Sequence, residues 1–182
     1  MTELLIFCAG TAFFAYVSRR ALLNPRSHGF YRFIAWECML ALVLINFPMW
    51  TVDPFSPQQI VSWVLLASSI ALAVNAVRLL KQIGRPSTER QDAELFAFEK
   101  TSQLVTTGLF RYIRHPMYAA LLYLAWGAYL KDISLASTAL VGVASVALVI
   151  TALRDEAECL QHFGAAYADY MKSSKRFVPF IV

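Results

Sequence analysis

The sequence predicts an all-α protein that crosses a lipid bilayer several times. Hydrophobic residues make up 58% of the 182 residues and charged residues only 15%, whereas soluble domains have about 45–50% apolar and about 25% charged residues. The apolar residues gather into five runs, and a membrane-spanning helix requires roughly 17–25 mostly apolar residues. The basic residues gather in alternate connections between these runs, as is typical of polytopic membrane proteins.

Each of the five runs is interpreted as one transmembrane helix. The first is expected to be retained, because Glu3 replaces the basic start of a signal peptide and no small-residue cleavage site follows. The fourth is short, and only Lys131 and Asp132 separate it from the fifth, so these two are expected to form a tight helical hairpin. The predicted spans are Leu4–Ser18, Phe33–Val52, Gln58–Val77, Pro116–Leu130 and Ile133–Leu153.

The basic residues predict the orientation of the chain. With five spans, all of the 16 basic residues except Lys131 fall on one face, which the positive-inside rule assigns to the cytoplasm. The N-terminus is then outside, and the C-terminus and a C-terminal helix are cytoplasmic. The net charge of +4 is therefore interpreted as a topology signal and not as a sign of nucleic-acid binding. The two longest polar segments, Gln82–Phe110 and Arg154–Val182, lie on this face and predict a site there.

One acid lies in the middle of an apolar stripe after the fifth span. If Arg154–Ser174 is one helix, Glu156 shares a face with five apolar or aromatic residues. A buried acid requires a partner, which is either an internal arginine or a polar ligand; a helix start also tolerates an acid. We favour the ligand. The other members of the stripe are Leu153, Leu160, Phe163, Tyr167 and Tyr170.

A cluster of basic residues directly precedes the fourth span. Pro116 suits the first turn of a helix, so Arg114 and His115 lie where unpaired backbone N–H groups favour an anion such as a carboxylate or phosphate. On spacing alone, the commoner role of arginines at a helix end is to anchor it to lipid headgroups. Glu37 is a further acid inside a span, either a site residue or an acid tolerated near a helix start. Its role is left open.

No metal site is predicted. Cys8, Cys38 and Cys159 are far apart and are interpreted as free thiols. The histidines show none of the spacings that are typical of zinc ligands. Asn46 and Asn75, inside the spans, are expected to hydrogen-bond between helices.

Two segments together resemble one family. They are LVTTGLFRYIRHPMY, Leu104–Tyr118, and DEAECLQHFGAAYADYMKSSKRFVP, Asp155–Pro179. They resemble the RHPxY block and the paired-acid, Phe-Gly, Tyr-x-x-Tyr and R-F-x-P tail of the small integral-membrane methyltransferases, which include the isoprenylcysteine carboxyl methyltransferases and the phospholipid methyltransferases. As in that family, the two blocks occur in this order with one helical hairpin between them.

The resemblance implies that S-adenosylmethionine binds in a cytoplasmic pocket. The pocket would be formed by the RHP segment, the hairpin and the acidic C-terminal helix, about residues 104–179 of a single domain spanning 1–182. Two positions depart from the family pattern: Asp155 replaces the usual glutamate, and Ala120 replaces a glycine found in many members. Carried over by position, the catalytic residues are Arg114, His115 and Tyr118, and the cofactor-binding residues are Leu104, Gly108, His115, Tyr118, Asp155 and Glu156.

The methyl acceptor is expected to be a lipophilic small molecule or a lipid-bearing molecule, and no obligate protein partner is implied. Arg114 would orient an acidic acceptor, or His115 or Tyr118 would accept a proton from a neutral one. Two alternatives remain: a membrane reductase of the sterol reductase type that uses NADPH, and a non-catalytic lipid-binding protein. Residues 82–103 either shape the acceptor entrance, with Phe96 and Phe98 toward lipid, or form a surface linker.

Overall fold

The computed structural model describes residues 1–85, 95–96 and 99–179. Most of these residues form helices, and Ile113 and Lys175 form an isolated parallel β-bridge. The predicted all-α class is therefore confirmed. The α-helices are α1 Thr2–Val17, α2 Arg19–Leu22, α3 His28–Asn46, α4 Pro57–Gln82, α5 Pro116–Tyr129, α6 Leu135–Phe163 and α7 Ala165–Ser173; the 3-10 helices are η1 Phe47–Met49 and η2 Gly108–Arg111.

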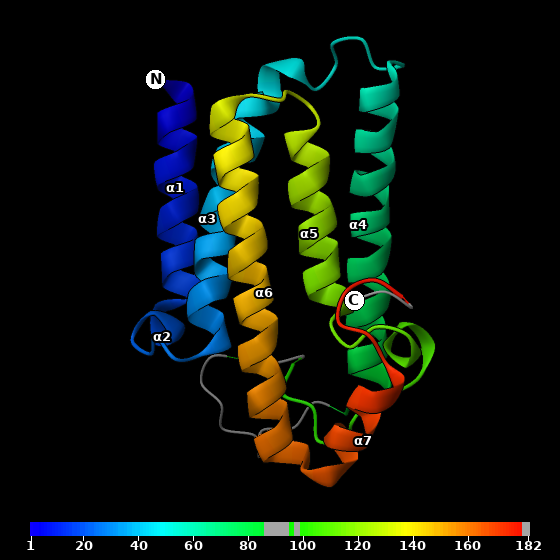
Figure 1. The fold of residues 1–182 in the computed structure, drawn as a ribbon. Coiled ribbons are helices and arrows are strands. Elements are labelled where there is room, and N and C mark those ends of the chain that lie inside the picture. The colour runs from blue at the N-terminus through cyan, green and yellow to red at the C-terminus, as the bar shows by residue number, and fades with distance from the viewer. Residues whose placement is uncertain (86–94, 97–98, 180–182) are drawn as a thin grey trace.

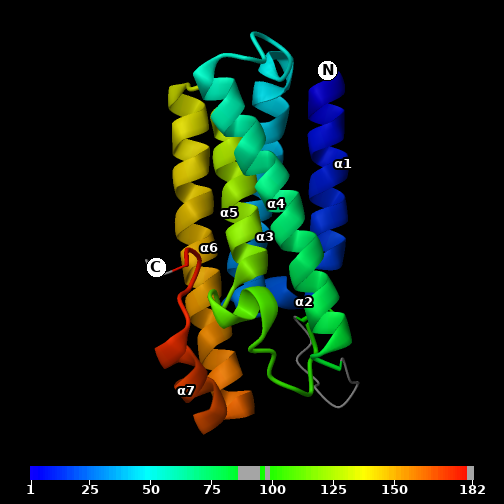
Figure 2. The ribbon, with the colours of Figure 1, turned by 90° about the vertical axis from the view of Figure 1, so that its right-hand side faces the viewer.

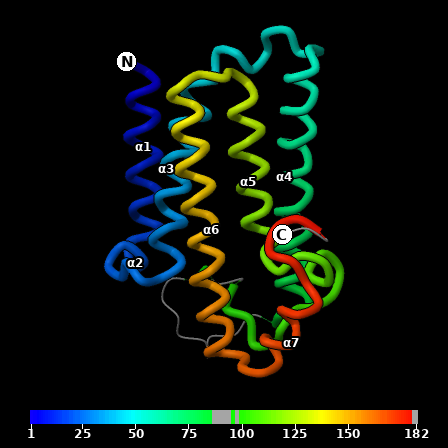
Figure 3. Tube along the Cα trace, in the orientation of Figure 1, coloured from blue at the N-terminus to red at the C-terminus, as the bar shows by residue number. Residues whose placement is uncertain are grey.

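Helices α1, α3, α4, α5 and α6 lie alongside one another as a bundle (Figures 1 and 2). Helix α3 packs against α1 and α6, and α5 packs against α4 and α6. The bundle has two ends. The first, where α3 begins and where α4 and α6 terminate, is called the pocket end, after the pocket described below. The opposite end, near residues 47–56 and 130–134, is called the far end. The tube in Figure 3 shows α2, α7 and the connection before α5 gathered toward the pocket end.

Three helical segments are long and apolar enough to cross a membrane, namely His28–Met49, Pro57–Gln82 and Leu135–Phe163. Their outer faces expose large apolar side chains such as Ile60, Val64 and Val146, which are suited to contact with lipid. The chain is an integral membrane protein. With 16 residues in α1 and 14 in α5, these two helices are shorter, and the five-span topology stays a prediction.

Serine side chains begin two of the long helices. The Ser56 hydroxyl accepts a hydrogen bond from the backbone N–H of Gln59 at the start of α4, where Pro57 occupies the first turn. The Ser134 hydroxyl accepts one from the backbone N–H of Ser137 at the start of α6. Each contact satisfies a backbone donor that has no partner within its helix.

Small residues let α5 pack closely against its neighbours. Ala125 and Ala128 of α5 are fully buried in the core, together with Ala144 of α6. A Cβ atom added at Gly127 would lie 2.9 Å from Leu66 Cγ of α4, so the backbones of α4 and α5 approach closely only because this position has no side chain. Such small-residue contacts are typical of helix packing in membranes.

Buried polar contacts connect the helices at the far end. Asn46 Nδ2 donates to the carbonyl oxygens of Ala128 and Asp132, at 2.9 and 3.2 Å, which confirms that Asn46 links helices. Lys131, predicted as a connecting residue, is buried; its Nζ donates to Gln59 Oε1 at 3.0 Å. The corresponding prediction for Asn75 is wrong, because its amide donates to the carbonyl oxygen of Ala71 within α4.

The helix predicted over residues 154–174 is interrupted at Gly164. Helix α6 continues from the predicted fifth span to Phe163, and Gly164, with φ 58° and ψ −132°, separates it from α7. The left-handed side of backbone space favours glycine. The predicted apolar stripe is accordingly only partly right: Glu156, Tyr167 and Tyr170 are buried, whereas Leu153 and Leu160 are exposed.

Candidate functional site

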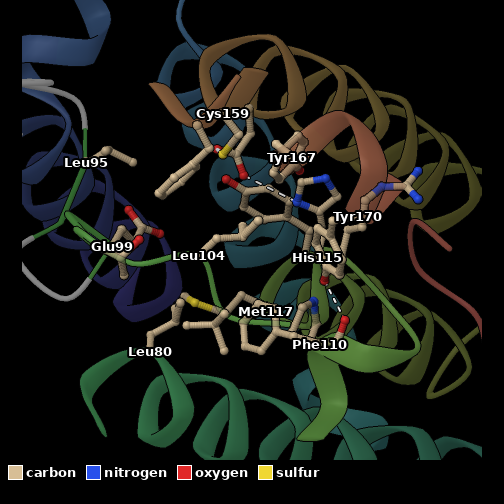
Figure 4. A pocket seen from close by; sticks show the side chains of 17 residues that line it. Leu80, Leu95, Glu99, Leu104, Phe110, His115, Met117, Cys159, Tyr167 and Tyr170 are labelled. Atoms are coloured by element: carbon tan, nitrogen blue, oxygen red, sulfur yellow. Dashed lines mark hydrogen bonds and ion pairs between the residues drawn. The ribbon is translucent and has the colours of Figure 1, made fainter. Parts of the chain in front are cut away.

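A pocket that is partly open to solvent lies at the pocket end (Figure 4), and its empty space, including the open solvent at its mouth, is about 690 Å³. Its walls come from the ends of α4 and α6, the start of α5, α7 and the connection before α5. Of the predicted site residues, it is lined by Leu104, Arg114, His115, Tyr118 and Asp155.

Two predicted cofactor residues, Gly108 and Glu156, lie outside the described lining of this pocket. Gly108 adopts φ 60° where η2 begins, and a Cβ atom there would lie 2.8 Å from Leu79 Cδ1 of α4. The glycine therefore permits both the turn and a close approach to α4. In the structure, Gly108 forms a backbone turn that precedes the RHP segment.

The C-terminal segment holds the backbone of the RHP segment. The backbone N–H of Arg114 donates to the carbonyl oxygen of Lys175 at 2.7 Å, and that of His115 donates to the carbonyl oxygen of Arg176 at 3.2 Å. In return, the N–H of Lys175 donates to the carbonyl oxygen of Tyr112 at 2.9 Å. The two blocks that resemble the methyltransferase family are therefore in direct contact.

Glu156 is the centre of a buried ion-pair cluster. Its carboxylate accepts from Arg114 Nε at 3.0 Å, from Arg176 Nε and Nη2 at 3.1 and 2.9 Å, and lies 3.4 Å from His115 Nε2. Arg114 also donates to the carbonyl oxygens of Met171 and Ser174. The interpretation of Glu156 as the partner of an internal arginine thus describes its contacts.

His115 connects this cluster to the pocket. Its Nδ1 lies 3.3 Å from Asp155 Oδ2 and its ring is stacked on that of Tyr118, with centroids 5.3 Å apart. Burial alone would lower the pKa of His115, but hydrogen bonds to Asp155 and Glu156 outweigh burial and raise the pKa above its ordinary value. A protonated ring donates through both nitrogens, which matches a carboxylate on each side.

Helix α7 supplies two phenol side chains to the pocket wall. The Tyr170 hydroxyl donates to the carbonyl oxygen of Phe110 at 2.5 Å, and the Tyr167 and Tyr170 rings are in edge contact. Burial raises the pKa of both phenols, so they stay neutral and act as hydrogen-bonding and apolar surface.

Sequence reasoning missed a second charged pair at the pocket. Nη1 of Arg32 lies 3.1 Å from each carboxylate oxygen of Glu99, and Glu99 lines the pocket. Arg32 had served only as a topology signal, and Glu99 fell within residues 82–103, which were interpreted either as an acceptor entrance or as a surface linker. The one available signal was the spacing of His28 and Arg32, which places both on one face of a helix.

His28 pairs with α6 next to the pocket. Its Nδ1 lies 2.6 Å from Glu158 Oε2, and its backbone N–H donates to Glu158 Oε1 at 3.1 Å. Atoms of His28, Asp155 and Glu158 that can ligate a metal lie within 4.8 Å of one another, a grouping that no short sequence spacing reveals because His28 is far from the other two in the chain. The short contact between His28 and Glu158 accounts for much of this proximity.

Glu37 and Phe96, whose roles the sequence left open, contact other side chains of the helix bundle. Glu37 accepts a hydrogen bond from the Thr11 hydroxyl at 2.6 Å, so it links α3 to α1 and is not among the described pocket residues. Phe96 stacks on Trp36 with centroids 5.9 Å apart. Phe98 and most of the segment around it lie outside the described residues.

The fold and the pocket define a helical membrane protein with a pocket at one end of its bundle whose lining includes charged residues. The family model of phospholipid methyltransferase matches residues 57–175, and the chain belongs to this family. Membership implies a membrane methyltransferase with a lipid-type substrate, as the resemblance predicts, and favours it over a reductase or a passive lipid-binding protein. No curated protein and no solved structure matches the chain.

Proposed function

We propose that this protein transfers a methyl group from S-adenosylmethionine to a lipophilic acceptor that reaches the pocket from the membrane. The main support is that His115, Tyr118 and Asp155 line a single pocket. His115 and Tyr118 belong to one of the two segments that resemble the family, and Asp155 belongs to the other. Membership in the phospholipid methyltransferase family supports the same reaction. The basic residues near the pocket end support a cytoplasmic pocket and C-terminus with an outer N-terminus.

The charges of the pocket fit the amino-acid part of the cofactor, which carries a carboxylate and an ammonium group. We assign the carboxylate to the backbone N–H groups at the start of α5. Arg114 and His115 contribute positive charge nearby and not hydrogen bonds, because their described donors already face Glu156, Asp155 and backbone carbonyls. We assign the ammonium group to Asp155, which lies beside His115. When bound, the cofactor supplies an activated methyl group.

The neutral walls of the pocket suit the remainder of the cofactor. Leu104 and Met117 offer apolar surface, and Tyr167 and Tyr170 offer aromatic rings. Methyl transfer depends mainly on alignment and on the exclusion of water, and a largely apolar pocket serves both purposes. Glu156 contributes by positioning: it holds Arg114 and His115 at the pocket without lining it.

The contacts of Arg114 and His115 bear on how the acceptor binds. Nε and Nη1 of Arg114 already donate to Glu156 and to backbone carbonyls, which argues against Arg114 as the group that orients an acidic acceptor. Both nitrogens of His115 face carboxylates, which argues against His115 as a proton acceptor. The carboxylates of Asp155 and Glu99 are the acidic groups in the described lining.

Protection of Cys159 from alkylation tests this proposal. Cys159 lines the pocket, whereas Cys8 and Cys38 do not, so a variant with Cys8→Ser and Cys38→Ser reports on the pocket alone. In lipid nanodiscs, S-adenosylhomocysteine is expected to slow alkylation of Cys159 by a maleimide at least tenfold, and NADPH is expected to leave the rate unchanged. Protection by NADPH alone, or an unchanged rate with S-adenosylhomocysteine, would contradict the proposal.

A further inference from the structure

The pocket has a second polar position, away from the His115 corner. Figure 4 shows Glu99 and Leu95 on one side of the pocket and His115 and Tyr170 on the other. Besides Glu99, the lining includes the apolar residues Leu80, Leu95 and Leu104 and one neutral polar residue, Thr101. One carboxylate in a mainly apolar surrounding fits a molecule with a hydrocarbon body and one polar group.

Glu99 is held rigidly in this position. Arg32 donates to both of its oxygens at 3.1 Å, and the backbone N–H of Phe96 donates to Oε2 at 2.9 Å. The Arg32 guanidinium also lies 4.4 Å from the ring centroid of Phe96 and 5.2 Å from that of Trp36. The side chains of Arg32 and Glu99 are only 5% and 10% exposed, so neither is free to turn toward solvent.

The carboxylate of Glu99 retains acceptor capacity toward the pocket. A carboxylate oxygen offers about two lone-pair sites. Among the described contacts, Oε2 accepts from both Arg32 and Phe96, whereas Oε1 accepts from Arg32 alone. One site on Oε1 is therefore left for a donor. Glu99 lines the pocket and Arg32 does not, so a ligand meets the carboxylate first.

The charges around this position disfavour a second carboxylate. The cations in the described lining, Arg114 and His115, pair with Glu156 at the other side of the pocket. A ligand carboxylate beside Glu99 would thus face a like charge, while the adjacent cation, Arg32, already pairs with both oxygens of Glu99 and does not line the pocket. Like charges in contact disfavour binding. A hydroxyl, amine or thiol group can instead donate a hydrogen bond.

We propose that Glu99, positioned by Arg32, binds the nucleophilic group of the acceptor and selects a hydrogen-bond donor over a carboxylate. This inference rests on the proposed function, in which the cofactor occupies the His115 side. Arg32 precedes the family-matched residues 57–175, so the acceptor side depends on a residue outside the matched part of this chain. Arg32 is a positioning residue, because it acts through Glu99.

Three eight-carbon probes test the selection: octan-1-ol, octylamine and octanoate. Each is titrated by calorimetry into the full-length protein in zwitterionic nanodiscs, with and without S-adenosylhomocysteine, and the heat from empty nanodiscs is subtracted. The wild-type protein is expected to bind the alcohol and the amine at least tenfold more tightly than octanoate. Octanoate binding as tightly as octan-1-ol would overturn the proposal.

The double variant Arg32→Gln/Glu99→Gln removes both charges together, which avoids leaving one buried charge unpaired; glutamine matches the size of Glu99 and is shorter than Arg32. The tenfold preference is expected to fall below threefold in this variant. A preference that stays at tenfold would overturn the role of Glu99. The control Asp169→Asn/Lys172→Gln removes an exposed ion pair of 2.7 Å and is expected to keep the wild-type preference.

The same experiment distinguishes a failure of the proposed function from a failure of the Glu99 assignment. If the wild-type protein prefers donors over octanoate but does not bind S-adenosylhomocysteine, the assignment of Glu99 as a binding residue holds and the cofactor assignment is wrong. If S-adenosylhomocysteine binds and the wild-type protein shows no preference for octan-1-ol and octylamine over octanoate, only the assignment of Glu99 is wrong.

Discussion

His115 Nε2 lies 3.4 Å from Glu156 Oε1, although 41 positions separate the two residues in the chain. The contact joins the start of α5 to the end of α6, and the backbone of the C-terminal segment lies against it. His115 faces the pocket while Glu156 stands behind it. Cofactor affinity and folding stability are therefore expected to depend on the same cluster of charges.

Glu156→Gln should weaken both folding and binding. The change removes one charge that faces Arg114, Arg176 and His115 in a buried cluster, and the loss of one partner from a buried ion pair lowers stability by about 3–5 kcal/mol. Affinity for S-adenosylhomocysteine should fall at least about tenfold, roughly 1.4 kcal/mol. Thermal unfolding in detergent and calorimetry measure the two effects. An unchanged affinity in a folded variant would show that Glu156 supports the fold alone.

The stability of the protein should fall as the pH rises above the ordinary pKa of histidine. The pKa of His115 is raised from 6.5 in the folded protein, so its stabilising contribution is complete below pH 6.5 and is lost as the pH passes through the raised value. The unfolding midpoint, followed from about pH 6 to about pH 9, should decrease more steeply in wild type than in His115→Gln. Equal slopes would contradict a protonated His115 between two carboxylates.

Two glycines, one within α6 and one directly after it, should respond to alanine in opposite directions. Gly164, at φ 58° and ψ −132°, occupies backbone space that strains other residues by about 1–3 kcal/mol, so Gly164→Ala should destabilise. Gly142 lies within α6 with open space around its Cα, so Gly142→Ala should stabilise by about 0.5–1 kcal/mol. Denaturation of both variants measures the difference. A Gly164→Ala protein as stable as wild type would argue against the break between α6 and α7.

Lys131→Met should destabilise the fold without affecting the pocket. The Lys131 ammonium donates to Gln59 and lies 3.4 Å from the ring centroid of Trp63 at the far end. Loss of this charged hydrogen bond lowers stability by about 1.5–3 kcal/mol. Affinity for S-adenosylhomocysteine should stay within about twofold of wild type, because additivity holds for distant sites. A large loss of affinity would reveal coupling between the two ends of the bundle.

Local patterns in the sequence were sufficient to predict the start of α5 and the burial of Glu156, because both features lie within short motifs. The RHP cluster before a proline predicted a helix start, and α5 begins at Pro116. The acid in an apolar stripe predicted a buried Glu156 that needs a partner, and a polar ligand was favoured over an internal arginine, whereas the described partners are Arg114 and Arg176. The first inference rests on the preference of proline for the first turn of a helix, and the second rests on the periodicity of a single helix.

Contacts between distant segments were beyond these patterns. No periodicity connects Arg32 with Glu99, which are 67 positions apart, and the pair forms only when α3 and the connection before α5 pack together. The same holds for His28 and Glu158. The interruption at Gly164 was noticeable only as a glycine, because the sequence does not reveal whether a helical glycine takes a positive φ.

Binding of S-adenosylhomocysteine to the purified protein in nanodiscs, measured by calorimetry beside NADPH, tests the central claim most directly. The convergence of His115, Tyr118 and Asp155 on one pocket predicts saturable binding of S-adenosylhomocysteine that His115→Ala weakens at least tenfold, with no binding of NADPH. Binding of NADPH alone, or binding of S-adenosylhomocysteine that His115→Ala leaves unchanged, would contradict it.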